Sequence, residues 1–341
     1  MDLLYAGLDV SDKKTHICLV DGTGKVRWQG VCATDPEALS RLLKKRAPFL
    51  GKVIFETGAL SCFLYHGLLR RGLPVSCICA RHAKGVLSTR LNKSDVNDAE
   101  GLAQLARTGW YKTVHIKDRN THLDRTFLRV RHQLVKSHAD MLNQLRGLLK
   151  LFGLKLGQVT TPGKRHERLF YLFKQEPALE PMLIPLITAL DALEQEICKL
   201  NKRMKKRTAT DPVCRRLMTI PGVGPIVALT FKASIEDPAR FKHSRDVGAY
   251  AGLTPKRFQS GDMDVSGHIS KRGDHLLRRA LYEAANSVLG RLKKDCALKT
   301  WGQRLAEQKG PKRARVAVAR KLAILMHKLW ISEQDFVWQK A

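Results

Sequence analysis

The chain has 341 residues, with 61 Lys+Arg against 31 Asp+Glu, which gives a formal charge of +30. This length allows two or three domains with buried cores. The charge excess indicates a polyanionic partner, foremost nucleic acid, because cations that neutralise phosphates release counterions. A merely basic, ribosome-like protein is the competing interpretation.

Membrane and metal-thiolate classes are not favoured. No stretch is long and apolar enough to span a bilayer, and the N-terminus lacks the regions of a signal peptide, so we expect a cytoplasmic protein, nucleoid-associated when bound to DNA. The eight cysteines are scattered, and Cys77 and Cys79 are the only close pair. We therefore expect reduced, buried thiols rather than zinc ligands.

The first hundred residues alternate strand and helix patterns. Apolar, β-branched runs predict three successive strands near 3–11, 15–23 and 26–34, then further strands near 52–58 and 74–80. Helices are predicted at 35–47, with an Asp35 cap and Pro36 in the first turn, and at 59–72. The order βββαβαβ is that of an RNase H-like nuclease core.

Acidic residues fall at the ends of two of these strands. Asp9 ends the first and Glu56 the fourth, and Asp95 and Asp98 lie three residues apart, on one face of a helix that follows. Four converging carboxylates would repel each other unless divalent cations neutralise them, and hard oxygen ligands favour Mg²⁺ or Mn²⁺. This arrangement suits phosphoryl transfer on nucleic acid.

Each acid also has a structural interpretation. Asp95 can cap its helix, with Asp98 favoured by the helix dipole, and the other two can be solvated strand ends. Three further acids are possible substitutes in a metal site: Asp12, Asp21 and Glu100.

The middle of the chain predicts two long helices. One apolar face recurs from Phe127 to Phe152, and a second seam has heptad spacing. The seam consists of Leu186, Leu190, Leu193, Ile197, Leu200 and Met204. The two apolar faces predict that these helices pair, either with each other in an intramolecular hairpin or with a second chain in a dimer interface. A basic run at 201–207 extends the second helix, and residues after 110 carry +24 of the total charge.

Residues 217–231 have the pattern of a helix-hairpin-helix. Gly222 and Gly224 permit a tight turn whose backbone N–H groups can hold a phosphate without reading sequence, although a packing hairpin is the alternative.

A polar loop running into a helix is predicted over 249–285. It holds three serines, Ser260, Ser266 and Ser270, any of which could be an exposed nucleophile. Surrounding cations could bind nucleic acid or stabilise a pentavalent phosphate, and they include Arg257, Lys271, Arg272 and Arg278.

The stretches GLDVS, FETGA, KSDVNDAEGLA, IPGVGP and YAGLTPKRFQSG together resemble the DEDD-type insertion-sequence transposases, which include Piv-like DNA invertases and bridge-RNA-guided recombinases. The resemblance covers nearly the whole chain. It implies a RuvC-like DEDD domain over 1–115, coiled-coil helices over 116–208, and a mainly helical C-terminal transposase domain with helix-hairpin-helix and serine over 209–341.

The resemblance also implies a mechanism. Asp9, Glu56, Asp95 and Asp98 would be the metal-binding tetrad, and Ser260 the nucleophile that becomes joined to DNA, in a composite site assembled across subunits of a dimer or tetramer. A structured non-coding RNA would pair with donor and target DNA. We therefore expect the transposase of a mobile element.

Three rival functions remain. A RuvC-like structure-specific endonuclease would use the carboxylates and water, and a Piv-like invertase would use the same chemistry on a chromosomal segment. A non-catalytic nucleic-acid-binding protein would not need all four acids.

Overall fold

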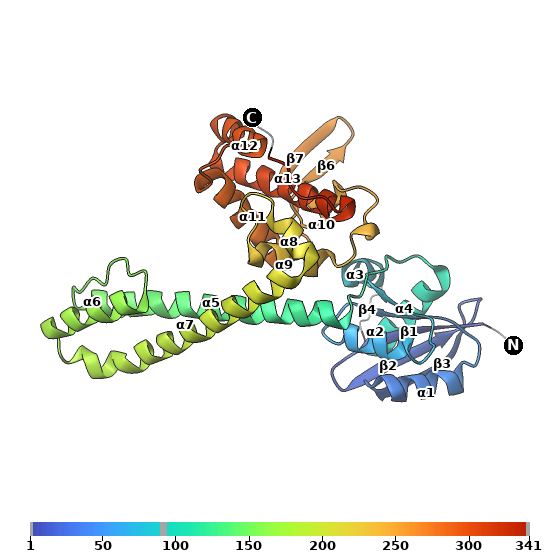
Figure 1. Ribbon diagram of the computed structural model, residues 1–341. Helices are drawn as coiled ribbons and strands as arrows, with labels where there is room; N and C mark the ends of the chain where they lie inside the picture. The colour runs from blue at the N-terminus through green and yellow to red at the C-terminus, as the bar shows by residue number, and fades with distance from the viewer. Residues whose placement is uncertain (1–2, 89–93, 339–341) are drawn as a thin grey trace. The chain divides into compact units, whose positions relative to one another are not determined.

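The computed structural model describes residues 3–88 and 94–338 (Figure 1). The chain divides into two compact units, residues 1–119 and 120–341. Each unit has its own hydrophobic core. The three-part division made from the sequence stays a prediction, and helix α7 (Leu179–Thr210) runs without a break across its second boundary, between residues 208 and 209.

The first unit is a mixed α/β layer structure around a five-stranded sheet. The strand order is β3-β2-β1-β4-β5; β1, β2 and β3 pair antiparallel, whereas β1, β4 and β5 run parallel. The strands are β1 (Leu4–Val10), β2 (Lys14–Val20), β3 (Val26–Ala33), β4 (Leu50–Glu56) and β5 (Val75–Ile78). The predicted element order βββαβαβ is confirmed.

Helices cover both faces of this sheet, which explains why its central strands are apolar on both sides. One face packs against α1 and α2, and the other against α4. The helices of this unit are α1 (Pro36–Arg46), α2 (Ser61–Leu69), α3 (Ala80–Leu87) and α4 (Asp95–Thr108). As predicted, the Asp35 side chain caps α1 by accepting from two backbone N–H groups of its first turn.

The second unit begins with an intramolecular helical hairpin. The helices α5 (Arg119–Leu151) and α7 (Leu179–Thr210) run antiparallel, with α6 (Pro162–Gln175) between them in sequence (Figure 1). Side chains link the two long helices, from Arg131 to Asn201 at 2.7 Å and from His138 to Glu194 at 2.7 Å. Of the predicted seam, Leu190 and Met204 are buried, whereas the residues between them are half-buried.

The rest of the second unit is a helical core carrying one β-hairpin. The hairpin corrects the prediction of a loop over this segment: β6 (Pro255–Ser260) pairs with β7 (Met263–Ile269) through a two-residue turn. The helices are α8 (Pro212–Met218), α9 (Pro225–Ile235), the 3-10 helix η1 (Pro238–Arg240), α10 (Asp246–Tyr250), α11 (His275–Gly290), α12 (Ala297–Lys309) and α13 (Pro311–Ser332).

Two further expectations concerned buried cysteine thiols and the absence of a membrane-spanning segment. All eight cysteines are free thiols and four are buried, but Cys198 is exposed on α7, so the expectation of burial is wrong there. Among residues 3–88 and 94–338, none of the helices is both long and apolar enough to cross a bilayer.

Candidate functional site

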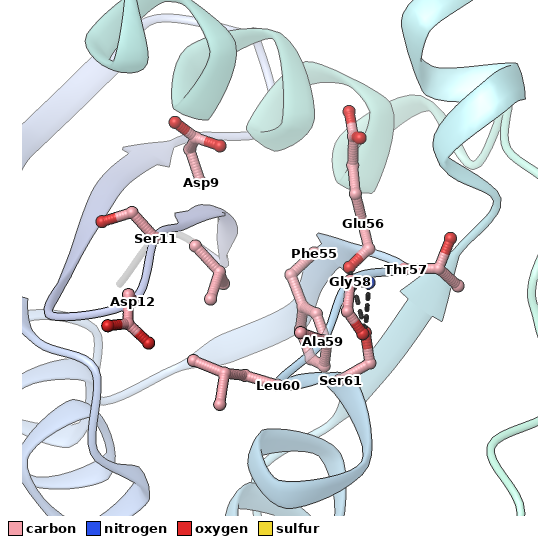
Figure 2. Close-up of a pocket in the computed structure, with 11 residues that line it drawn as sticks. Asp9, Ser11, Asp12, Phe55, Glu56, Thr57, Gly58, Ala59, Leu60 and Ser61 are labelled. Carbon is pink, nitrogen blue, oxygen red and sulfur yellow. Dashed lines mark hydrogen bonds between the residues drawn. The ribbon is translucent and has the colours of Figure 1, made fainter. Parts of the chain in front are cut away.

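The parallel pairing of β1 and β4 places two acids at one edge of the sheet. Leu8 pairs with Phe55, and the residue that follows each one is a carboxylate, Asp9 or Glu56. Both carboxylates line one cavity of about 240 Å³ (Figure 2). Its wall consists of Asp9–Asp12 and Phe55–Ser61.

Ser61, one of the residues that line the cavity, fixes the loop after β4 through hydrogen bonds to Gly58. The Ser61 hydroxyl accepts from the Gly58 N–H at 2.5 Å and donates to the Gly58 carbonyl at 2.8 Å (Figure 2). These bonds hold residues 58–61 in a tight turn directly after Glu56. The Glu56 side chain therefore leaves a rigid backbone at the strand end.

Helix α4 brings a third acid to the same edge because it lies unusually close to β1. A Cβ atom on Gly7 would lie 2.1 Å from the Ala99 carbonyl oxygen and 2.2 Å from the Ala103 nitrogen. Only glycine permits this approach of helix backbone to strand backbone. Asp95 precedes Ala99 by one turn and so lies on the helix face that meets the sheet.

The first turn of α4 shows that Asp95 is not the helix cap. Ser94 is the N-cap, and its hydroxyl accepts from the Asn97 N–H at 3.2 Å. This corrects the capping interpretation of Asp95. The Asp95 carboxylate instead lies 3.5 Å from His16 Nε2, and His16 is the cross-strand partner of Asp9.

The donor chemistry of this edge suits a hard divalent cation, although the carboxylates are not drawn together. Asp9, Glu56 and Asp95 supply oxygen ligands, as Mg²⁺ and Mn²⁺ prefer, and Asp98 follows in the first turn of α4. Within the described residues, no three His, Cys, Asp or Glu side chains are close enough to hold a metal ion together. The segment that leads into α4, including Lys93, lies outside those residues.

The three acids considered as alternative metal ligands, Asp12, Asp21 and Glu100, lie in different places. Asp21 lies at the end of β2, which runs opposite to β1, so it is at the other edge of the sheet. It is buried and accepts from Thr23, Lys25 and Arg27, and these hydrogen bonds lower its pKa to about 2. Asp21 is therefore a turn residue. Asp12 does line the cavity, and Glu100 lies five residues beyond Asp95, away from the sheet-facing stripe.

In the second unit, the β-hairpin separates the three serines. Ser260 ends β6 beside the turn, where Gly261 has a φ of 53°, and its side chain lies on the same face as its partner Met263. Ser266 pairs with Arg257 on the opposite face. Ser270 lies at the hairpin base, where its Oγ accepts from the Arg272 N–H at 3.4 Å.

The cations predicted to bind nucleic acid have different structural partners. Arg257 makes a bidentate ion pair with Asp264, at 2.7 and 2.5 Å. Arg278 donates to the carbonyls of Ala251 and Arg272, at 3.2 and 3.3 Å. Arg278 thus braces the loop that carries the two exposed cations, Lys271 and Arg272.

That loop is tightly fixed. Lys271 has a φ of 52°, a strained value for a residue with a side chain, and its N–H donates to Gly252 at 3.1 Å. A Cβ on Gly252 would lie 2.1 Å from the Arg272 carbonyl oxygen, so the two segments meet backbone to backbone. The exposed cations therefore project from a rigid base.

Two family models match separate parts of the chain. A model described as a transposase of DEDD IS110 type matches residues 6–153, and one described as "Transposase IS116/IS110/IS902 family" matches residues 214–300. The chain is 29% identical over 343 aligned residues to the transposase for insertion sequence element IS1111A of Coxiella burnetii, covering 98% of this chain and 92% of that protein. It is 31% identical to a probable family 20 transposase of Pseudomonas aeruginosa, covering 69% and 71% of the two chains. The chain belongs to the IS110 family of insertion-sequence transposases.

The family membership makes this protein an enzyme, a DNA-cleaving recombinase. A structure of Thermus thermophilus RuvC is also similar, at 14% identity and a TM-score of 0.25 over 33% of this transposase and all of that chain. A shared fold does not follow from a score of that size.

The transposase has a cavity with three cationic side chains beside the start of α9. The cavity, of about 450 Å³, lies between α7 and the start of α9 and is lined by Arg131, Cys198, Asn201, Lys202, Met204, Lys205, Pro225 and Ile226. Gly224 is the N-cap of α9, and nothing lies within 4 Å of where its Cβ would be. Gly222 instead packs against α11, where a Cβ would lie 2.7 Å from the Ala284 carbonyl oxygen.

The sequence analysis missed the β-hairpin, and it also missed the contacts of His16 and Arg131. Alternating side chains over 255–269 around a Gly-Asp pair are the usual signal for a hairpin with a two-residue turn. Neither His16 nor Arg131 was singled out. Burial lowers the pKa of Arg131, and only the fold shows that its guanidinium reaches Asn201 on the other long helix.

Proposed function

We propose that this protein is the transposase of an insertion sequence, a site-specific recombinase that cuts DNA with a DEDD carboxylate site and a serine nucleophile. The observation that carries the proposal is the shared cavity of Asp9 and Glu56, with Asp95 brought to the same sheet edge by α4. The first unit is proposed to be RNase H-like, which its strand order supports.

Asp9, Glu56, Asp95 and Asp98 are proposed to hold Mg²⁺ or Mn²⁺. A divalent cation bound there would neutralise the charge that develops on the phosphate oxygens. The carboxylates would hold this cation at the sheet edge, and the turn at Gly58 and Ser61 keeps Glu56 in place. Removal of any one acid would take away an oxygen ligand and so weaken binding of the cation.

Ser260 is proposed to attack the phosphorus of the DNA backbone. Its Oγ forms a new P–O bond, the bond from phosphorus to the leaving deoxyribose oxygen breaks, and the serine proton passes to an acceptor while the leaving oxygen gains one. One phosphodiester replaces another, so a strand can be rejoined later without ATP. Exposure supports Ser260 over the half-buried Ser270, and Ser260 is preferred to the equally exposed Ser266 because it directly precedes Gly261 at the hairpin turn.

The nucleic-acid contacts are proposed to follow the backbone rather than the bases. The start of α9, with Gly224 and the neighbouring Lys202 and Lys205, suits a phosphate. Lys271 and Arg272, at the base of the hairpin that carries Ser260, suit a second contact. We propose donor and target DNA as substrates and a structured non-coding RNA as guide, with α5 and α7 acting as a coiled coil in a dimer or tetramer.

A trapping assay tests the function. The protein is incubated with Mg²⁺, labelled DNA from the end of its element and RNA from the flanking non-coding region, and a denaturing gel shows whether label migrates with protein. We expect a covalent band that disappears in Ser260→Ala and in Asp95→Ala, and persists in Asp21→Asn. Cut DNA without attached protein, cut equally by Ser260→Ala, would establish a RuvC-like nuclease instead. Inversion of a flanked segment in place of transposition would establish a Piv-like invertase.

A further inference from the structure

The β-hairpin of the second unit has one apolar face and one polar face. Phe258 and Val265 are cross-strand partners, and Ser260 and Met263 are the next pair on the same face. Phe258 is 62% exposed, Met263 67% and Val265 57%. Three large apolar side chains thus surround the serine and face solvent. Gln259 pairs with Asp264 on the other face.

The apolar face is held rigidly on the body of the unit. A Cβ on Gly267 would lie 3.4 Å from the Phe258 Cε2 atom, so the phenyl ring lies over this glycine and is supported by its backbone. At the hairpin base, Ser270 N–H donates to Thr254 at 2.8 Å and Lys271 N–H to Gly252 at 3.1 Å. The hairpin is therefore anchored at one end and exposed at the other (Figure 1).

The charge around this face favours nucleic acid as its occupant. Residues 255–273 carry four Lys or Arg and two Asp, and the ion pair of Arg257 with Asp264 on the polar face leaves three cations against one acid. Lys256 shares the apolar face, since its Cβ also lies 3.9 Å from a Cβ placed on Gly267. Proteins that kink DNA combine apolar wedges with basic residues in this way. A second protein chain would be a poorer match for so basic a border.

The spacing relates the aromatic ring to the attacked phosphate. Two residues along a strand span about 7 Å, roughly the rise of two base pairs at about 3.4 Å each. With Ser260 at a phosphate, Phe258 therefore lies level with a base step one or two positions away. Met263, directly opposite Ser260, lies closer still to the cut.

We propose that Phe258, supported by Met263 and Val265, inserts into the DNA beside the phosphate that Ser260 attacks and unstacks a base step there. The proposal rests on the proposed function, because it takes Ser260 as the nucleophile. Unstacking opens the backbone at that step, which positions the phosphate for in-line attack. Phe258 is thus a positioning residue that acts on DNA and takes no part in bond making.

The test measures unstacking without cleavage. Full-length protein carrying Ser260→Ala is bound, with Mg²⁺ and the flanking RNA, to element-end DNA in which 2-aminopurine replaces one base at a time. We expect a several-fold rise in fluorescence at one step, its loss with the added change Phe258→Ala, and partial retention with Phe258→Leu. Gln259→Ala, on the polar face of the same strand, is the matched control and should keep the full rise.

Cleavage by single changes in the wild-type background gives the second readout. We expect Phe258→Ala to slow formation of the covalent band by roughly 10²-fold, as misplacement of reacting groups does, without changing affinity for the DNA ends in proportion. Thermal melting of Phe258→Ala close to that of the wild type confirms folding, because the ring is exposed.

The outcomes separate this proposal from the function on which it rests. If DNA binds but 2-aminopurine fluorescence rises at no position, or rises equally with Phe258→Ala, the proposed insertion of Phe258 is overturned whatever the trapping assay gives. If Phe258→Ala instead dissociates a protein oligomer without DNA and leaves the fluorescence unchanged, the face is a protein interface and the proposal is also overturned. If brightening depends on Phe258 but no covalent band forms, the wedge holds and the serine assignment fails.

Discussion

At the scale of single residues, absence of a side chain is as informative as any carboxylate. Gly7 allows α4 to approach β1, and this approach brings Asp95 to the sheet edge where Asp9 lies. The position of a proposed metal ligand therefore depends on a residue that cannot bind metal.

We expect Gly7→Ala to lower the free energy of unfolding by about 3 kcal/mol, at the upper end for overpacking, because the new methyl group meets helix backbone rather than a movable side chain. It should also weaken Mg²⁺-dependent cleavage, since α4 must move away from β1. Urea denaturation and the trapping assay measure the two effects. Gly22→Ala is the control, because nothing lies within 4 Å of that Cβ; an equal loss there would refute the packing argument.

Asp21 gives a prediction about pH. Its folded-state pKa is lowered from 3.8 to about 2 by hydrogen bonds from Thr23, Lys25 and Arg27. A depressed carboxyl pKa stabilises the fold above the unfolded-state value, and that contribution is lost as pH falls through the folded value. The difference in urea midpoint between wild type and Asp21→Asn should therefore be constant above about pH 5 and shrink between about pH 4 and pH 2. A difference that grows on acidification would contradict this sign.

Two aspartates show how far sequence could go at this scale. Asp9 and Asp21 look alike as residues at strand ends, and only strand direction separates them. Because β2 runs back along β1, its end lies at the far edge of the sheet. Adjacent Ser94 and Asp95 are similarly ambiguous as helix caps until backbone geometry assigns the cap to Ser94.

At the scale of elements, a buried arginine joins helix α6 to helix α7 of the long helical hairpin. Arg165 on α6 is 2% exposed and donates to Glu194 at 2.6 and 3.0 Å and to Asp191 at 2.5 Å, both on α7. Hydrogen bonds from Arg165 and His138 lower the pKa of Glu194 although burial opposes this. One guanidinium thus fixes α6 against α7.

We expect Arg165→Met to destabilise the protein by about 3–5 kcal/mol, because it leaves two carboxylates without their cation. Adding Asp191→Asn and Glu194→Gln should recover part of the loss, since no unpaired charge then remains. Arg168→Met, an exposed change on the same helix, should have little effect. If the triple variant were as unstable as Arg165→Met alone, the loss would come from packing and not from charge. Chemical denaturation measures all three.

Elements with strong periodicity were predicted correctly, whereas the serine hairpin was missed. The strands of the first unit are apolar runs with clear turns, and α1 carries its cap and proline in the sequence. Residues 255–269 alternate in side-chain type around their Gly-Asp pair, but they are exposed on nearly every side and lack the apolar runs of the other strands. Their glycines and serines favoured a loop, whereas the Gly-Asp turn closes them into a hairpin.

At the scale of the whole molecule, the charge is unequally divided. Residues 1–119 carry 19 basic and 11 acidic side chains, a net +8, which leaves +22 for residues 120–341. The sequence alone predicted this distribution, because counting charges requires no fold. We therefore expect the unit with the carboxylates to contribute less to phosphate binding than the unit with Ser260.

This separation of chemistry between units yields a prediction about the assembled enzyme. Asp9→Ala chains keep Ser260, and Ser260→Ala chains keep the carboxylates, so a mixed homo-oligomer holds one intact copy of each. If subunits share active sites, mixing two inactive variants should restore the covalent product, and a size tag should show DNA only on the Asp9→Ala chain. Mixed oligomers that form, as co-purification would verify, yet make no product would mean that each chain supplies both parts of its own site. The size tag, which shows which chain carries the DNA, decides the assignment, because DNA on the Ser260→Ala chain would exclude Ser260 as the nucleophile.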